Sequence, residues 1–151
     1  MKKFRFPLRS VATVRSMIEL RAREQFSRAV QASVAAEKKL IEQRARVSEL
    51  ESILRSGRLT RFLAADQATF MAALKDETAI ITKFTADLNS ARREMESARQ
   101  AWLESRRDVR VIENLEQKAR TAHLHEVERE NQAAMDDRTG AMVARASFNL
   151  T

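Results

Sequence analysis

The residues best suited to chemistry are His123 and His125, the only histidines in the 151-residue chain. Two positions apart on a helix, their side chains point in different directions and cannot both ligate one metal ion. His125 and Glu126 begin like a zinc-protease motif, but Arg129 stands where the second histidine ligand is required. We therefore expect both histidines to be solvent-exposed side chains.

No other pattern indicates catalysis. With two glycines and no cysteine, the chain has no glycine-rich phosphate loop, no nucleophile elbow and no thiolate metal site. An acidic stretch near the C-terminus is more typical of a solvated helix face than of a metal site; it consists of Glu126, Glu128, Glu130, Asp136 and Asp137. We predict a non-enzymatic protein with no catalytic, cofactor-binding or metal-binding residue.

A cluster of arginines, Arg106, Arg107 and Arg110, could contact nucleic acid phosphates. Three acidic residues interrupt this cluster and would repel phosphate: Glu104, Asp108 and Glu113. We therefore favour structural or protein-contacting roles for these arginines and expect no nucleic acid partner.

The charge of the chain is unevenly distributed. The net charge is +7; residues 1–61 contain 15 Lys or Arg against 6 acids, and residues 62–151 contain 13 against 15. A basic first half can attract nucleic acid, an anionic membrane or an acidic protein surface.

The absence of cysteine fits a reducing compartment, and no run approaches the roughly 18 apolar residues of a transmembrane helix. We expect a cytoplasmic protein.

Two long helices dominate the expected fold. Pro7 and Gly57 bracket 49 residues without Gly or Pro, and Gly57 and Gly140 bracket another 82. We predict one domain over residues 1–151, with helices at about 10–56 and 66–139, a loop at about 57–65 and a short C-terminal tail. Ser10 is the expected N-cap of the first helix.

Apolar residues in both helices repeat with alternating steps of three and four, which indicates a coiled-coil seam. The first seam runs from Phe26 to Leu54. Upstream, the apolar residues Val11, Val14, Ile18 and Ala22 lead to Phe26 with one extra four-residue step, which is a stutter. The second runs from Phe70 to Ala119.

Folding the chain back near residue 62 places large seam residues against small ones, with Ala22 facing Trp102 and Ala29 facing Met95. A parallel dimer would not require this complementarity. We predict an all-α fold, a two-helix antiparallel coiled coil whose second helix is longer than the first. Val11 would lie opposite Ile112, which leaves an overhang on the order of 40 Å that Phe4 and Phe6 cover only in part.

The opening segment, residues 1–26, resembles that of flagellar FliJ proteins, which typically show F-x-F-x-L followed by an arginine and then acids and alanines. This motif is matched by Phe4, Phe6, Leu8 and Arg15. The segments 102–115 and 130–138 are similar to the family's later parts, so the resemblance covers essentially the whole chain.

This resemblance implies a non-enzymatic, stalk-like coupling component of the flagellar type III protein export apparatus. It implies binding to the hexameric export ATPase, to the cytoplasmic portion of the export gate and to free export chaperones. It also implies a place in the cytoplasm, peripherally at the inner face of the cell membrane. Injectisome stalk proteins share the architecture.

By analogy with the stalk of rotary ATPases, the end that holds both termini would enter the ATPase ring. The residues expected to contact the ATPase are Arg5, Arg9, Arg15, Arg120 and Arg129. The loop end would be available to a second partner. Phe62 and Leu63 are the better candidates for this contact. Phe70 and Leu74 are also candidates, but they belong to the seam as well.

Two other interpretations remain open from the sequence. A basic coiled coil could bind nucleic acid or an anionic membrane surface through its first half, and a coiled coil could also be a filament component. Salt-sensitive retention on DNA or acidic liposomes would favour nucleic-acid or membrane binding. Strictly monomeric behaviour would argue against a filament component.

Overall fold

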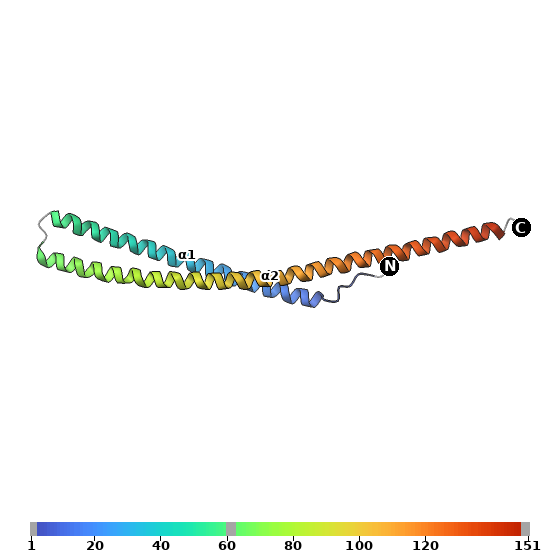
Figure 1. The fold of residues 1–151 in the computed structure, drawn as a ribbon, viewed down its shortest axis with the longest axis horizontal. Helices are drawn as coiled ribbons and strands as arrows, with labels where there is room; N and C mark the ends of the chain where they lie inside the picture. The colour runs from blue at the N-terminus through green and yellow to red at the C-terminus, as the bar shows by residue number, and fades with distance from the viewer. Residues whose placement is uncertain (1–2, 60–62, 149–151) are drawn as a thin grey trace. The chain divides into compact units, whose positions relative to one another are not determined.

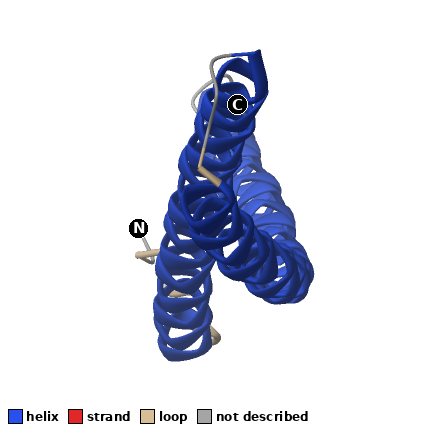
Figure 2. Cartoon of the chain, turned by 90° about the vertical axis from the view of Figure 1, so that its left-hand side faces the viewer, coloured by secondary structure: helices blue, strands red, loops and turns tan. Residues whose placement is uncertain are grey.

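The computed structural model describes residues 3–59 and 63–148, which form two helices (Figure 1). Helix α1 spans Arg9–Leu59 with 51 residues, and α2 spans Ala64–Phe148 with 85 residues. The described residues contain no strand, as Figure 2 shows. The predicted all-α hairpin with a longer second helix is confirmed.

The described chain forms two compact units, and both helices contribute to each of them. The first unit contains residues 3–18 and 105–148, and the second contains residues 19–59 and 63–104. We call them the terminal unit and the hairpin unit. That the whole chain behaves as one domain stays a prediction.

Backbone carbonyls just outside each helix accept its first hydrogen bonds. In α1, the amide of Ala12 donates to Leu8 O at 2.9 Å, so Ser10 lies inside the first turn and is not the expected N-cap. In α2, the amides of Asp66 and Gln67 donate to Leu63 O at 3.0 and 3.1 Å. Asp66 lies in the first turn of α2, where a carboxylate interacts favourably with the helix dipole.

Neither glycine ends a helix, which corrects the expected boundaries. Gly57 is buried inside α1, and Gly140 lies inside α2, which continues to Phe148 instead of ending near residue 139. A glycine costs a helix only about 1 kcal/mol relative to alanine. The residues after Gly140 include three alanines, a methionine and an arginine, which favour helix and outweigh that cost.

The hairpin unit buries the predicted seam. Every predicted seam position from Phe26 to Leu54 in α1, and from Phe70 to Trp102 in α2, is buried or half-buried. The most buried apolar residues of this unit are Leu40, Val47, Leu54 and Leu88, each at most 8% exposed. Two helices bury only one stripe each, so this core is a thin line of side chains rather than a thick layer.

Contacts across the hairpin unit agree with the predicted antiparallel register. The rings of Phe26 and Trp102 stack, with centroids 5.6 Å apart and planes 8° apart. Trp102 Nε1 donates to Glu19 Oε1 at 2.8 Å. Ala22, the predicted neighbour of Trp102, lies one helical turn from both Glu19 and Phe26.

Polar side chains occupy the middle of this seam. Gln43 is 4% exposed, and its Nε2 donates to the Glu77 backbone carbonyl at 3.1 Å and to the Glu77 carboxylate. A buried polar pair of this kind contributes less to stability than an apolar pair, but it disfavours any register that leaves it unpaired.

The terminal unit departs from the sequence prediction. The predicted stutter through Val11, Val14 and Ile18 is wrong, because these three residues are 39%, 55% and 51% exposed. The half-buried positions are Ala12 and Arg15 in the terminal unit and Glu19 and Ala22 in the adjoining part of the hairpin unit. They continue the three-four alternation without interruption. Long polar side chains can hold seam positions at the end of a helix because their heads reach partners on the other helix.

The continuation of α2 through Gly140 can be tested by Gly140→Ala. An added Cβ would meet no heavy atom within 4 Å, so alanine should stabilise the helix around it by up to about 1 kcal/mol. Amide hydrogen exchange of residues 136–148 should slow, and far-UV circular dichroism should show increased helicity. Ala141→Gly serves as the reciprocal control and should have the opposite effect. A loss of helicity in Gly140→Ala would instead indicate a left-handed glycine that ends the helix there.

Candidate partner-binding surfaces

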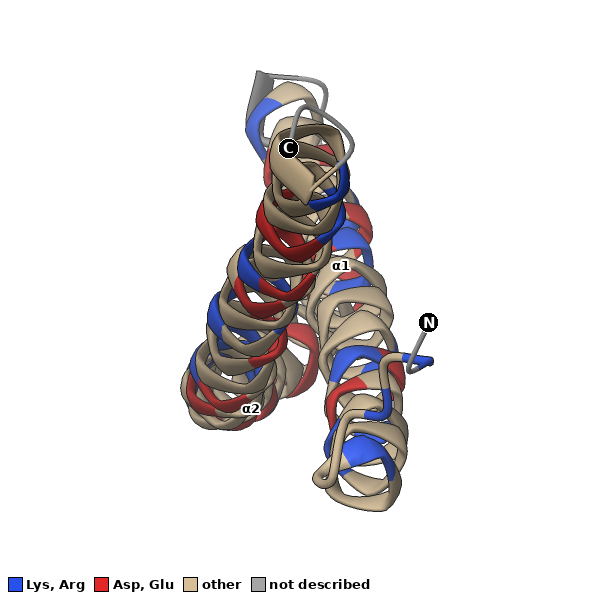
Figure 3. Cartoon of the chain, turned by 90° about the vertical axis from the view of Figure 1, so that its right-hand side faces the viewer, with Lys and Arg blue, Asp and Glu red and all other residues tan. Residues whose placement is uncertain are grey.

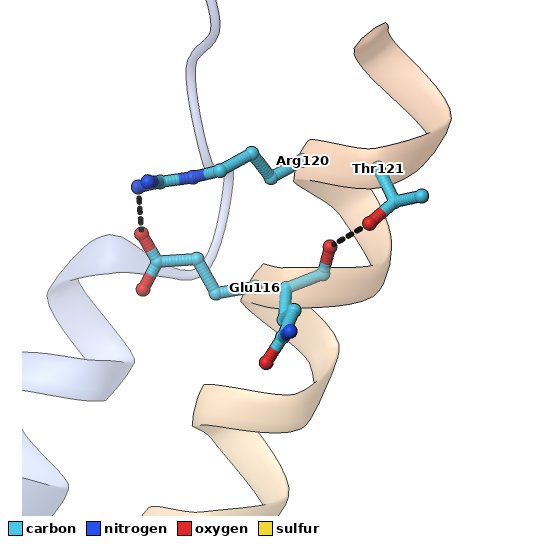
Figure 4. Close-up of polar contacts among 4 residues, drawn as sticks. Glu116, Arg120 and Thr121 are labelled. Atoms are coloured by element: carbon cyan, nitrogen blue, oxygen red, sulfur yellow. Dashed lines mark hydrogen bonds and ion pairs between the residues drawn. The ribbon is translucent and has the colours of Figure 1, made fainter. Parts of the chain in front are cut away.

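The segment before α1 packs on α2 in the terminal unit. The rings of Phe4 and His123 lie edge to face with centroids 5.6 Å apart, and Arg120 Cζ lies 5.7 Å from the centroid of the Phe4 ring. Figure 4 shows Arg120 reaching from α2 toward this segment, with its guanidinium 3.5 Å from Glu116 Oε1. Phe4 therefore covers part of α2, as expected, and His123 is half-buried rather than fully exposed.

All five predicted ATPase-contact arginines lie in the terminal unit, but they differ in exposure and in ion pairing. Arg15 Nη1 lies 2.7 Å from Asp108 Oδ2, which joins α1 to α2. Arg5 and Arg9 are exposed, and neither forms an ion pair with another described residue. Arg129 is exposed on α2. Arg5, Arg9 and Arg129 are therefore the predicted arginines that remain available to a partner.

The ion pairs of this unit are exposed and individually weak. The side chains of Arg15 and Asp108 are 38% and 62% exposed, and those of Arg120 and Glu116 are 64% and 39% exposed. Such pairs contribute about 0 to 1 kcal/mol each because water and salt screen them. They orient side chains more than they stabilise the fold.

Beyond these contacts, α2 is uncovered. From Glu128 to Phe148 every residue of α2 is exposed, including Met135 at 70% and Met142 at 73%. Figure 3 shows basic and acidic residues interspersed along both helices. An uncovered helix that carries both apolar and charged side chains is typical of a protein-binding surface.

Sequence reasoning missed a groove between the helices of the terminal unit. The groove has a volume of about 420 Å³ and is lined by Val11, Val14, Arg15 and Ile18 of α1 and by Ser105 and Asp108 of α2. Alternating steps of three and four residues, continued from Phe26 toward the N-terminus, would have indicated this groove. That count places Arg15 and Glu19 in the seam and turns the apolar residues outward.

The second-partner candidates lie in the hairpin unit. Leu63 is 73% exposed, whereas Phe70 and Leu74 are half-buried in the seam. Phe62 lies outside the described residues. Among the described candidates, Leu63 is the residue that presents the most surface to a partner.

The described residues contain no group of three or more His, Asp or Glu side chains that could hold a metal ion. His125 is exposed, as expected, and its Nδ1 lies 3.7 Å from Glu128 Oε2. Neither described helix contains a stretch long and apolar enough to cross a membrane.

An antiparallel pair of long helices packed along a three-four seam defines the class of antiparallel coiled-coil proteins. The family model described as flagellar FliJ protein matches residues 4–147. The chain therefore belongs to the FliJ family, a non-catalytic component of flagellar protein export, and is associated with the flagellar export apparatus. The searches found no match among curated proteins and none among solved structures.

Proposed function

We propose that this chain couples the export ATPase to the export gate without catalytic activity of its own. In this proposal the terminal unit binds the hexameric ATPase, and the hairpin unit binds the cytoplasmic portion of the gate. The chain also assists the cycling of export chaperones. It acts in the cytoplasm, held peripherally at the inner face of the cell membrane by the export apparatus. Membership of the FliJ family supports this assignment.

The observation that carries the ATPase contact is the charge of the segment that precedes and begins α1. Residues 1–18 contain five Lys or Arg and no Asp or Glu, and Arg5 and Arg9 are exposed without an ion-pair partner among the described residues. A concentrated positive charge accelerates encounter with an acidic surface and orients the docked protein. This is the property that a helix pair entering a ring requires.

The basic coiled coil that binds nucleic acid or an anionic membrane remains the alternative proposal. The same exposed cations support it. Binding of the chain to acidic liposomes or DNA, without binding to the ATPase, would favour that alternative.

Reversal of Arg5, Arg9 and Arg15 to Glu tests the ATPase contact. Single exposed charges contribute little, but their combined reversal should weaken binding to the ATPase hexamer by about tenfold or more and reduce its dependence on salt. Titration calorimetry or light scattering across a salt series measures both effects. The matched control reverses Arg21, Arg23 and Arg28, which are exposed on α1 in the hairpin unit. Unchanged affinity in a folded triple variant would contradict the proposed contact.

The gate contact is tested by replacing Phe62 and Leu63 together with Ala. Loss of two apolar side chains at a binding site should weaken binding to the cytoplasmic portion of the gate by at least about tenfold. Leu63 is exposed and forms no part of the seam, so its replacement should change the melting temperature little. Ile41→Ala, at an exposed position of α1, is the control. Intact gate binding in the double variant would rule out this placement.

A further inference from the structure

Covered and exposed side chains alternate in the segment before α1. Phe4 and Phe6 are half-buried, whereas Lys3 and Arg5 are exposed. Residues 3–6 lie outside any helix, and the alternation is that of an extended chain, whose successive side chains point to opposite sides. One side of this segment therefore packs on α2, and the other side carries cations. We name residues 3–8 the N-terminal strap.

The N-terminal strap covers a part of α2 that lies beyond the end of α1. The pair between Arg15 and Asp108 places Arg9, the first residue of α1, level with position 114 of α2. His123 lies nine positions later, about 14 Å along the helix axis, and is nevertheless half-buried. Its ring lies edge to face with the ring of Phe4, so the strap is what covers it.

The contacts that hold the strap are aromatic and cationic. The centroids of the Phe4 and His123 rings are 5.6 Å apart, and Arg120 Cζ lies 5.7 Å from the centroid of the Phe4 ring. Arg120 also lies 3.5 Å from Glu116 Oε1, as Figure 4 shows, so its cation is engaged within the chain. Each contact of these kinds is favourable but weak. The docked strap therefore depends on the Phe4 ring, which takes part in both contacts.

We propose that Phe4 and His123 are positioning residues: their contact docks the strap on α2 in the free chain and thereby presents Lys3 and Arg5 to the acidic surface of a partner. This inference rests on the proposed ATPase contact and adds what holds the cations of that contact in place. A docked strap has already lost the conformational freedom that a free segment would lose on binding, so its affinity is higher. If docking falls to about a tenth of the molecules, the apparent affinity falls about tenfold.

Nuclear magnetic resonance of the complete chain, without any partner protein, tests the docking itself. Rings whose centroids are 5.6 Å apart bring protons close enough for nuclear Overhauser cross-peaks between Phe4 and His123. The chain has two histidines, so the variant His125→Ala assigns the signals of His123. We expect these cross-peaks in the unmodified chain and their loss in Phe4→Ala. Their absence from the unmodified chain overturns the proposal.

A double-mutant cycle, measured by titration calorimetry with the ATPase hexamer, tests the positioning role. Phe4→Ala and His123→Ala should each weaken binding about tenfold, and the double variant should bind as weakly as either alone, because each change removes the same docked state. Additive losses would show that the two rings contact the ATPase independently and would overturn the positioning role. His123→Phe retains a ring beneath the strap and should restore binding. His125→Ala, at an exposed position of the same helix, is the matched control and should leave binding unchanged.

The salt dependence of binding separates this inference from the proposed function. Phe4→Ala leaves every cation in place, so binding should weaken while its dependence on salt is retained, whereas reversal of Arg5, Arg9 and Arg15 should reduce that dependence. Weaker binding of the arginine variant together with unchanged binding of Phe4→Ala would overturn the positioning role alone. Unchanged binding of the arginine variant would remove the ATPase contact itself, and the positioning role with it. Circular dichroism confirms that each variant remains helical.

Discussion

The antiparallel seam of the hairpin unit is the constraint on which the rest of the structure depends. Two helices bury only one stripe each, so no second layer can compensate for a misaligned seam. Stacking of Phe26 on Trp102 and the hydrogen bonds from Gln43 to Glu77 specify the alignment at two separated levels. Apolar burial supplies most of the free energy of folding, while the polar pair disfavours alternative registers.

That alignment determines which surfaces remain free. With the register set and α2 longer than α1, no other described residue shields the last part of α2, and every residue from Glu128 to Phe148 is exposed. The same uninterrupted heptad puts Arg15 in the seam of the terminal unit and turns Val14 and Ile18 outward. The candidate partner-binding surfaces are therefore consequences of seam geometry.

The sequence predicted the fold because the heptad pattern is local and repeated. Steps of three and four over many turns leave little doubt about which face of each helix is buried, and the positions from Phe26 to Leu54 were identified correctly. The N-terminal motif around Phe4, Phe6 and Leu8 also indicated the FliJ family, which the match to the family model shows.

The errors arose where hydrophobicity and geometry disagree. Val11, Val14 and Ile18 are apolar, so the sequence favoured them for the seam, but contacts from Arg15 to Asp108 and from Glu19 to Trp102 retain the regular heptad. Gly140 was expected to end α2, although one glycine costs too little to stop a helix formed by its neighbours. Contacts with partner proteins depend on the surfaces of those partners as well as on this chain. The assignment of the arginines to the ATPase and of the loop end to the gate therefore stays a prediction.

Cysteine cross-linking of the hairpin unit tests the antiparallel register most directly, because the natural chain contains no cysteine. Ala29→Cys with Met95→Cys places two thiols at facing seam positions. Ala22→Cys with Met95→Cys displaces one thiol by seven residues, about 10 Å, which is beyond disulfide reach. Mild oxidation of dilute protein should give an intramolecular disulfide in the first variant and not in the second. A covalent dimer from the first variant, or faster closure in the second, would contradict the register.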